Sequence, residues 1–146
     1  MSKALYTAEA HVTGGRAEGH GVSGDGNLDV QLRYPTALGG DGDGTNPEEL
    51  FAVGFAACFE GALGAIARRE KLELGDVAID SKVSLYPTDE RGFKLGVELD
   101  VTIPGVSDAE QAREVVAAAH KVCPYSNATR GNIEVALVAN GQPLSD

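Results

Sequence analysis

The sequence is poor in positive charge, which limits the partners that it can have. Its 146 residues include 12 Lys and Arg against 22 Asp and Glu, giving a formal net charge of −10 at pH 7. Nucleic acids and anionic membrane surfaces are bound through an excess of basic side chains. The composition therefore argues against both as partners.

Long apolar runs are also scarce. Residues 1–15 lack the apolar run of a secretory signal peptide, so we expect a cytoplasmic protein. The one long apolar stretch, residues 50–67, has the length at which a membrane span must be considered. Glu60 interrupts this stretch and two arginines follow it, so we interpret it as a buried helix.

The pattern of a metal or phosphate site is missing as well. The two cysteines and the scattered His11, His20 and His120 match no known zinc spacing. DGDGTN at 41–46 begins like a calcium loop, but it lacks the glycine at position six, and Ala52 stands where the bidentate glutamate belongs. No phosphate-binding glycine motif occurs. We therefore expect no bound metal, flavin or haem.

What the chain does contain is the pattern of β-strands. Apolar and polar residues alternate through 28–32, 77–86 and 93–103, which is typical of strands with one buried face. The segment PTDERG between the last two predicts a hairpin loop. Residues 4–12 and 133–139 are further strand candidates.

A first helix is predicted from the segment TNPEEL. Asn46 is the expected N-cap, Pro47 suits the first helical position, and Glu49 completes a capping box. The helix continues to residue 70, and its small residues are Gly54, Ala56, Ala57, Gly61, Ala62, Gly64 and Ala65. Because each helical glycine costs about 1 kcal/mol relative to alanine, we expect close packing, with the same helix of a second subunit as the candidate partner.

A second helix is predicted from Ser107, which forms a capping box with Glu110, to the region of Cys123. It should end there because Pro124 disfavours the α conformation in the residue before it. The element order is then β-β-β-α-β-β-α-β. We expect an α+β fold, with antiparallel sheet packed on two main helices, in a single domain 1–146, followed by a disordered NGQPLSD tail.

The cysteines are the candidate reactive groups. Taken alone, Cys58 in the middle of an apolar helix is best explained as a small hydrophobic core residue. Cys123 lies at a helix C-terminus, where the dipole raises a thiol pKa. A thiolate at neutral pH therefore needs a cation, and the loop residues Arg16 and Arg130 are candidates. No nucleophile signature of a cysteine–histidine hydrolase surrounds either thiol.

Two motifs resemble those of a known family. GTNPEELFAVGFAACF (44–59) and VCPYSNATRGNI (122–133) closely resemble the cysteine motifs of the organic hydroperoxide resistance (Ohr) proteins, a branch of the OsmC-like family. TGGRAEG and DGNLDVQL are also similar, and the resemblance covers essentially the whole chain. It implies an OsmC/Ohr-like α+β fold and an intertwined homodimer with active sites at the subunit interface.

The resemblance also implies roles for particular residues. Cys58 corresponds to the peroxidatic cysteine and Cys123 to the resolving cysteine of a thiol peroxidase. Arg16 corresponds to the arginine that holds the peroxidatic sulfur as a thiolate, and Glu48 to the glutamate that orients this arginine. The substrate would be an organic hydroperoxide, met during oxidative stress. A dihydrolipoyl group, often on a lipoylated protein, would reduce the resulting disulfide.

Some alternatives stay open at this point. Glu48 and Cys58 are ten positions apart, which is about 15 Å along a straight helix. A shared site needs Arg16 to bridge this gap, a break in the helix, or a second subunit. The apolar surroundings expected for Cys58 come from three aromatic residues and favour organic hydroperoxides over hydrogen peroxide: Phe51, Phe55 and Phe59.

Two other functions compete with a peroxidase. A redox sensor or ligand-binding thiol protein on the same scaffold would be oxidised once, without turnover. A binding module with structural cysteines would show no thiol chemistry at all. Phe55, where the family often has tyrosine, and Glu60, where an apolar residue is more usual, are the departures from the family pattern.

Overall fold

The computed structural model describes residues 2–144. The chain divides into two compact units, Met1–Leu50 and Phe51–Asp146, and each is described by itself. Helix α1 (Pro47–Glu70) begins in the first unit and continues in the second. The single domain 1–146 stays a prediction.

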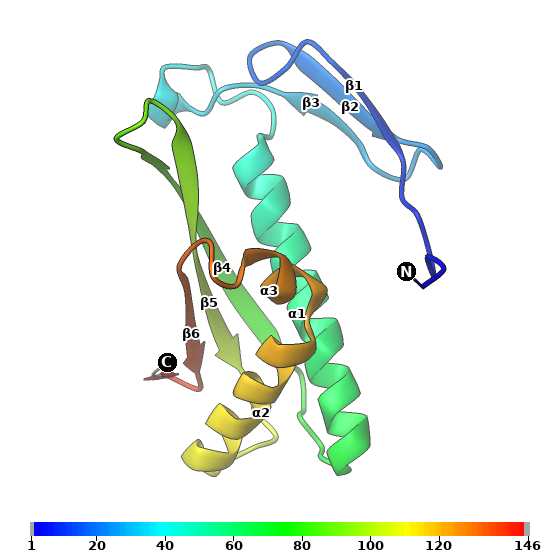
Figure 1. Cartoon of the computed structure of the whole chain (residues 1–146), viewed down its shortest axis with the longest axis vertical. Coiled ribbons are helices and arrows are strands. Elements are labelled where there is room, and N and C mark those ends of the chain that lie inside the picture. Colours follow the sequence, from blue (N-terminus) through cyan, green and yellow to red (C-terminus); the bar gives the residue numbers. More distant parts are fainter. Residues whose placement is uncertain (1, 145–146) are drawn as a thin grey trace. The chain divides into compact units, whose positions relative to one another are not determined.

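The first unit is a three-stranded antiparallel sheet in the order β1-β2-β3 (Figure 1). Its strands are short: β1 (Ala10–Thr13), β2 (Gly19–Ser23) and β3 (Asp29–Leu32). A 3-10 turn, η1 (Thr36–Leu38), lies within the glycine-rich loop that follows. The strand expected at 4–12 is therefore shorter and shifted, and the one expected at 28–32 is confirmed within one residue.

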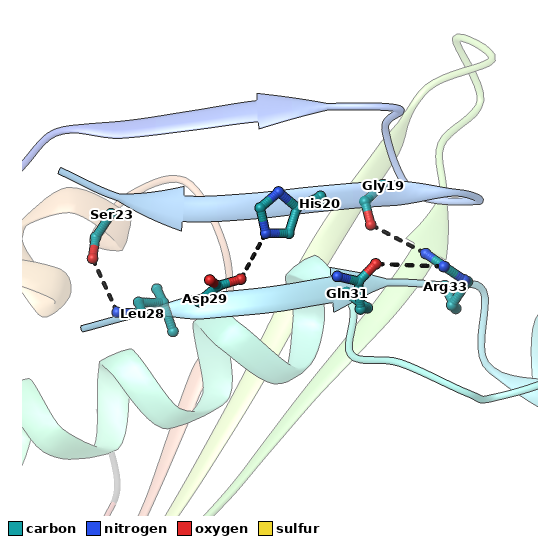
Figure 2. A network of polar contacts seen from close by, with 7 residues as sticks. All are labelled: Gly19, His20, Ser23, Leu28, Asp29, Gln31 and Arg33. Carbon is teal, nitrogen blue, oxygen red and sulfur yellow. Dashed lines mark hydrogen bonds and ion pairs between the residues drawn. The ribbon is translucent and has the colours of Figure 1, made fainter. Parts of the chain in front are cut away.

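Polar contacts hold this small sheet together at its edges (Figure 2). The Arg33 guanidinium donates to the carbonyl oxygen of Gly19 at 3.1 Å, which ties the start of β2 to the end of β3. Across the same strands, His20 Nε2 and Asp29 Oδ1 are 2.6 Å apart. Such contacts matter here because the unit buries few side chains, with Leu32 as its one buried hydrophobic residue among those described.

The second unit contains a four-stranded sheet in the order β4-β5-β6-β7. Its strands are β4 (Ala78–Pro87), β5 (Phe93–Thr102), β6 (Val135–Ala139) and β7 (Gln142–Pro143). β4 and β5 form the predicted hairpin. β5 and β6 pair in parallel, so the expected antiparallel arrangement is wrong at this pair. The reason is that two helices, α2 (Ala109–Val122) and α3 (Pro124–Thr129), form a crossover between the two strands.

The core of the second unit lies between this sheet and the helices α1 and α2 (Ala109–Val122), which cover one of its faces (Figure 1). Alternate residues of β5 point into it, and Leu99 and Val101 are fully buried. α1 contributes Phe55, Phe59 and Leu63, all at 0% exposure. The apolar residues that alternate along β5 and those on one face of α1 therefore pack together in one apolar layer.

The two helix starts differ in how well the sequence predicted them. Asn46 caps α1 as expected, accepting from the Glu49 backbone N–H at 2.8 Å, although the Glu49 carboxylate accepts from the Thr45 hydroxyl. In α2 the N-cap is Asp108, not Ser107, and it accepts from the Glu110 N–H. Both residue types cap helices well, so neighbouring candidates are hard to separate.

The region after α2 contains an element that the sequence analysis did not predict. A short helix, α3 (Pro124–Thr129), follows directly after Cys123. Further on, the predicted disordered tail is ordered up to Leu144, because β7 pairs with β6. Its residues 145 and 146 lie outside the described part of the chain.

Candidate functional site

The two cysteines lie side by side in the second unit. Cys58 and Cys123 are far apart in the sequence, yet their Sγ atoms are 3.7 Å apart, at hydrogen-bonding distance. Both are free thiols; Cys58 is partly buried and Cys123 is fully buried. A disulfide has an S–S length of about 2.05 Å, so the sulfurs need to approach by less than 2 Å to be joined.

The local sequence explains where each thiol sits. Cys58 is in the middle of α1, on the side that packs against the core. Cys123 ends α2 and begins α3 with an extended backbone (φ −64°, ψ 124°), the conformation that Pro124 imposes on the residue before it. Its Sγ accepts from the Ser126 backbone N–H at 3.5 Å. The proline therefore turns the chain so that Cys123 faces α1.

Within this unit, the environment does not favour a thiolate at Cys58. Burial raises the pKa of the Cys58 thiol, and the neighbouring Cys123 raises it further, while a hydrogen bond from the Tyr125 backbone N–H lowers it. A thiol needs its deprotonated form to act as a nucleophile. A thiolate at Cys58 therefore still requires a nearby cation, as expected from the sequence.

Cys58 lies in one apolar cluster with Phe51, Phe55 and Phe59, as expected, but the most accessible ring near the thiols is a different one. Phe55 and Phe59 are fully buried core residues, so neither presents a surface to a ligand. Phe51 is partly buried and packs on Tyr125, with ring centroids 5.7 Å apart. Tyr125 replaces the two buried phenylalanines as the accessible aromatic ring near the thiols, at 36% exposure. Sequence reasoning missed it, although its place two residues after Cys123 was a signal.

The first unit holds an ion pair. Arg16 Nη1 donates to both carboxylate oxygens of Glu48, at 2.9 and 3.1 Å. Glu48 lies in the first turn of α1, where the helix dipole favours a negative charge. The Glu48 carboxylate is largely buried, with 14% of its side chain exposed, whereas the Arg16 side chain is 38% exposed. The pairing of Arg16 with Glu48 agrees with the arrangement that the family resemblance implies.

Glycines shape the loop that carries Arg16. Gly14 and Gly15 have φ of 77° and 64°, the left-handed region that glycine adopts without strain. A Cβ atom on Gly14 would lie 2.3 Å from the carbonyl oxygen of Glu18, and one on Gly19 would lie 2.0 Å from that of Gly15. The TGGRAEG segment therefore needs its glycines to close this tight loop between β1 and β2.

The other expected features have mixed outcomes. α1 is continuous from Pro47 to Glu70, so a break in the helix is excluded as the means of bringing Glu48 to Cys58. The Arg130 guanidinium donates to Asn127 Oδ1 at 2.6 Å and to the His120 carbonyl oxygen. This candidate cation is therefore already engaged in other hydrogen bonds. Residues 2–144 contain no group of three or more His, Cys, Asp or Glu that could hold a metal ion.

α1 is long and apolar enough to cross a membrane by composition, and one third of its most apolar window is buried within the chain. Its buried residues form one face, which agrees with the predicted core helix. The opposite face is exposed at every fourth position: Val53, Ala57, Gly61 and Ala65. We call these four residues the exposed stripe of α1.

Comparison with known proteins identifies the family to which the chain belongs. The profile of the family described as OsmC-like protein matches residues 40–138. The chain therefore belongs to the OsmC-like family. Its similarity to relatives named organic hydroperoxide resistance protein extends over most of its length: one from Xanthomonas axonopodis pv. citri is 56% identical over 92% of this chain and 94% of its own.

Other relatives agree with this assignment. The organic hydroperoxide resistance protein OhrB of Bacillus subtilis is 49% identical over 92% of this chain and 97% of its own. A crystal structure of an organic hydroperoxide resistance protein from Legionella pneumophila superposes with a TM-score of 0.88, at 53% identity over 93% of this chain and 98% of that one. The resemblance to the Ohr branch and the expected α+β, OsmC/Ohr-like fold are confirmed.

A further crystal structure comes from Vibrio cholerae. It is described as a putative organic hydroperoxide resistance protein with captopril bound in one of its active sites. Its TM-score is 0.92 at 43% identity, and the match covers 97% of this chain and 96% of that chain. The similarity thus includes nearly every element of both units.

Proposed function

We propose that the protein is a cysteine-based peroxidase that reduces organic hydroperoxides to alcohols and acts in the response to oxidative stress. The observation that carries this proposal is the 3.7 Å separation of the Cys58 and Cys123 sulfurs. Two free thiols at this distance, in a chain whose relatives are named for resistance to organic hydroperoxides, are suited to a cycle between dithiol and disulfide. We expect this cycle to operate in the cytoplasm.

The first step is oxidation of Cys58. Its thiolate attacks one oxygen of the hydroperoxide, the O–O bond breaks, and the alkoxide leaves and takes up a proton to become the alcohol. The sulfur keeps one oxygen as a sulfenic acid, the first reversible stage of thiol oxidation. Cys58 is the better candidate for attack because it is partly accessible, whereas Cys123 is fully buried.

The second step joins the two sulfurs. Cys123 Sγ attacks the Cys58 sulfenic sulfur, the S–O bond breaks, and the oxygen leaves as water with the proton of the Cys123 thiol. This protects Cys58 from further, irreversible oxidation. A dihydrolipoyl dithiol, free or on a lipoylated protein, then reduces the disulfide by thiol–disulfide exchange and is itself oxidised to the cyclic disulfide.

Arg16 is proposed to supply the cation that Cys58 lacks within its own unit. A guanidinium is planar and permanently charged, so it can face the thiolate and the peroxide oxygens together. The bond to Glu48 holds Nη1 at 2.9 Å and limits the directions in which the guanidinium can point. Glu48 therefore acts as a positioning residue for Arg16.

The working protein is proposed to be a homodimer. The exposed stripe of α1 is made of small or apolar residues, with Val53 at 70% exposure. A Cβ atom placed on Gly61 meets nothing within 4 Å, so this side of the helix is open in the single chain. Small residues at every fourth position allow a second helix to approach closely, and the same stripe of a second subunit would cover this surface.

Steady-state reduction of cumene hydroperoxide tests the function, with dihydrolipoamide and then glutathione as reductant. We expect sustained turnover with the lipoyl dithiol, slow turnover with glutathione, and none in Cys58→Ser. Oxidation of wild-type protein once, with no turnover by any dithiol, would instead indicate a redox sensor. Hydroperoxide consumption that survives Cys58→Ser would leave the cysteines with a structural role.

A further inference from the structure

Tyr125 is seated directly on the backbone of α1, one turn before Cys58. A Cβ atom on Gly54 would lie 3.0 Å from the Tyr125 hydroxyl oxygen and 3.4 Å from two carbons of its ring. The ring also packs on the aromatic side chains at either side of this glycine, with centroids 5.7 Å from Phe51 and 5.6 Å from Phe55. Gly54 thus leaves the space that lets α3 lie close against α1.

Two backbone N–H groups next to this ring interact with the two sulfurs. The Tyr125 backbone N–H lowers the pKa of the Cys58 thiol and so opposes the larger effect of burial, which raises this pKa. The next N–H, of Ser126, donates to Cys123 Sγ at 3.5 Å. Any shift of Tyr125 on α1 therefore moves the two amides that fix the relative positions of the thiols.

We propose that Tyr125, seated on Gly54, is a positioning residue that sets the spacing of Cys58 and Cys123 and thereby the efficiency of disulfide closure. This inference deepens the proposed function and rests on it for its role in turnover. Closure requires the Cys123 sulfur to attack the Cys58 sulfenic sulfur along the S–O bond that breaks. Such a reaction gains most of its rate from preset distance and orientation, so loosening α3 should slow closure much more than it slows the first oxidation.

The contacts identify the ring, and not the hydroxyl, as the part that matters. The packing on Phe51 and Phe55 involves the ring alone, so Tyr125→Phe should keep closure close to that of the wild type. Gly54→Ala should push the ring away, because its new Cβ atom would come too close to the hydroxyl oxygen. Combining Gly54→Ala with Tyr125→Phe removes that oxygen and leaves ring contacts at 3.4 Å, so the double variant should regain closure.

A redox-buffer titration tests the spacing without any hydroperoxide. Full-length wild type and variants are equilibrated with reduced and oxidised glutathione, and the Cys58–Cys123 disulfide is quantified by alkylation and mass spectrometry. We expect Tyr125→Ala and Gly54→Ala to lower the effective concentration of the thiol pair by about tenfold or more, whereas Tyr125→Phe and the double variant stay within about threefold of wild type.

Rapid-quench oxidation with cumene hydroperoxide then separates the two chemical steps. Tyr125→Ala should form the Cys58 sulfenic acid within about threefold of the wild-type rate, close the disulfide about tenfold more slowly, and accumulate sulfinic acid. Tyr86→Ala is the matched control, since Tyr86 also lies over a glycine, Gly96, but on the sheet. It should change neither step.

The outcomes of these experiments distinguish the positioning role of Tyr125 from the proposed peroxidase function. Equal effective concentrations in wild type, Tyr125→Ala and Gly54→Ala would overturn the positioning role, whatever the protein does with peroxides. Failure of the double variant to recover would also overturn it, even if Tyr125→Ala were unstable. If the redox titration gives the expected differences between variants but hydroperoxides never oxidise the protein, the positioning role is supported and the proposed peroxidase function is refuted.

Discussion

The thiol pair and the ion pair lie in units of very different construction. Cys58 and Cys123 are held by a dense core in which α1, α2 and the β5 strand bury whole side chains. Arg16 and Glu48 are joined in a unit of three short strands with Leu32 as its buried hydrophobic residue. One pair is fixed by packing, and the other by a glycine loop and hydrogen bonds.

This difference separates two requirements of the proposed chemistry. Disulfide closure needs fixed sulfurs, and the second unit provides them without help from the first. Activation of Cys58 needs a cation, while burial within its own unit raises its pKa. In the proposed function, the activating group Arg16 belongs to the more weakly packed unit, where a small change in structure would alter reactivity without disturbing the thiol pair.

The largest effect should come from removing each of the two thiols in turn. Cys58→Ser should abolish hydroperoxide consumption, because no sulfenic acid can form. Cys123→Ser should still consume about one equivalent to form the Cys58 sulfenic acid, and a second equivalent where that acid is oxidised further to the sulfinic acid, and then stop. Quench-flow with intact-mass detection checks this prediction. Equal loss of the first equivalent in both variants would contradict the assignment of attack to Cys58.

Removing the cation should have the next largest effect. Arg16→Ala should lower the second-order rate with organic hydroperoxides by about 10²–10³-fold, the range for losing one preorganised electrostatic group. The pH profile of Cys58 alkylation should move to higher pH, because burial then raises the pKa with no cation to oppose it. The matched control is Arg130→Ala, whose guanidinium is engaged by Asn127 and the His120 carbonyl oxygen.

An unchanged alkylation profile in Arg16→Ala would show that the ion pair and the thiol pair act independently. Glu48→Gln sharpens this test, because it keeps the positive charge and weakens its positioning. We expect a smaller loss of rate than in Arg16→Ala and little shift of the Cys58 profile. Comparing the two variants separates the effect of the Arg16 charge from the effect of its orientation.

Assembly should be sensitive to the exposed stripe of α1. Gly61→Arg should yield a folded monomer in light scattering, because the added side chain has open space in one chain but obstructs a second helix. Gln111→Arg adds the same charge at an exposed position of α2 and should remain a dimer. A dimeric Gly61→Arg protein would place the subunit contact elsewhere.

The smallest predicted effect compares the stability of the two units. Backbone amides of β2 should exchange with deuterium faster than those of β5, because few buried side chains oppose local opening of the first sheet. Leu63→Ala should cost about 2–5 kcal/mol of unfolding free energy, since this side chain is fully buried. Equal exchange in β2 and β5 of the Gly61→Arg monomer would contradict the proposed difference between the units.

The sequence predicted the parts of the fold that depend on local patterns. Alternation located the β4–β5 hairpin, and Asn46 with Pro47 located the start of α1. The parallel pairing of β5 with β6 has no local signal, since it depends on a crossover through α2 and α3. α3 was missed because six residues are too few to show a helical period.

The candidate site shows a similar division. Elementary chemistry indicated that a reactive thiol here needs a cation, but it could not choose between Arg16 and Arg130. The family resemblance supplied the pairing of Cys58 with Cys123, which spacing alone could not reveal. The contact of Tyr125 with Gly54 appears only in three dimensions, because it depends on how α3 packs against α1.

The most direct test is to treat the reduced protein with one equivalent of cumene hydroperoxide and map its cysteines under non-reducing conditions. The account predicts a single disulfide between Cys58 and Cys123 of the same chain, with both thiols lost in equal amounts and one equivalent of alcohol formed. Oxidation confined to Cys58, with the Cys123 thiol still free, would contradict it, as would a disulfide between two chains.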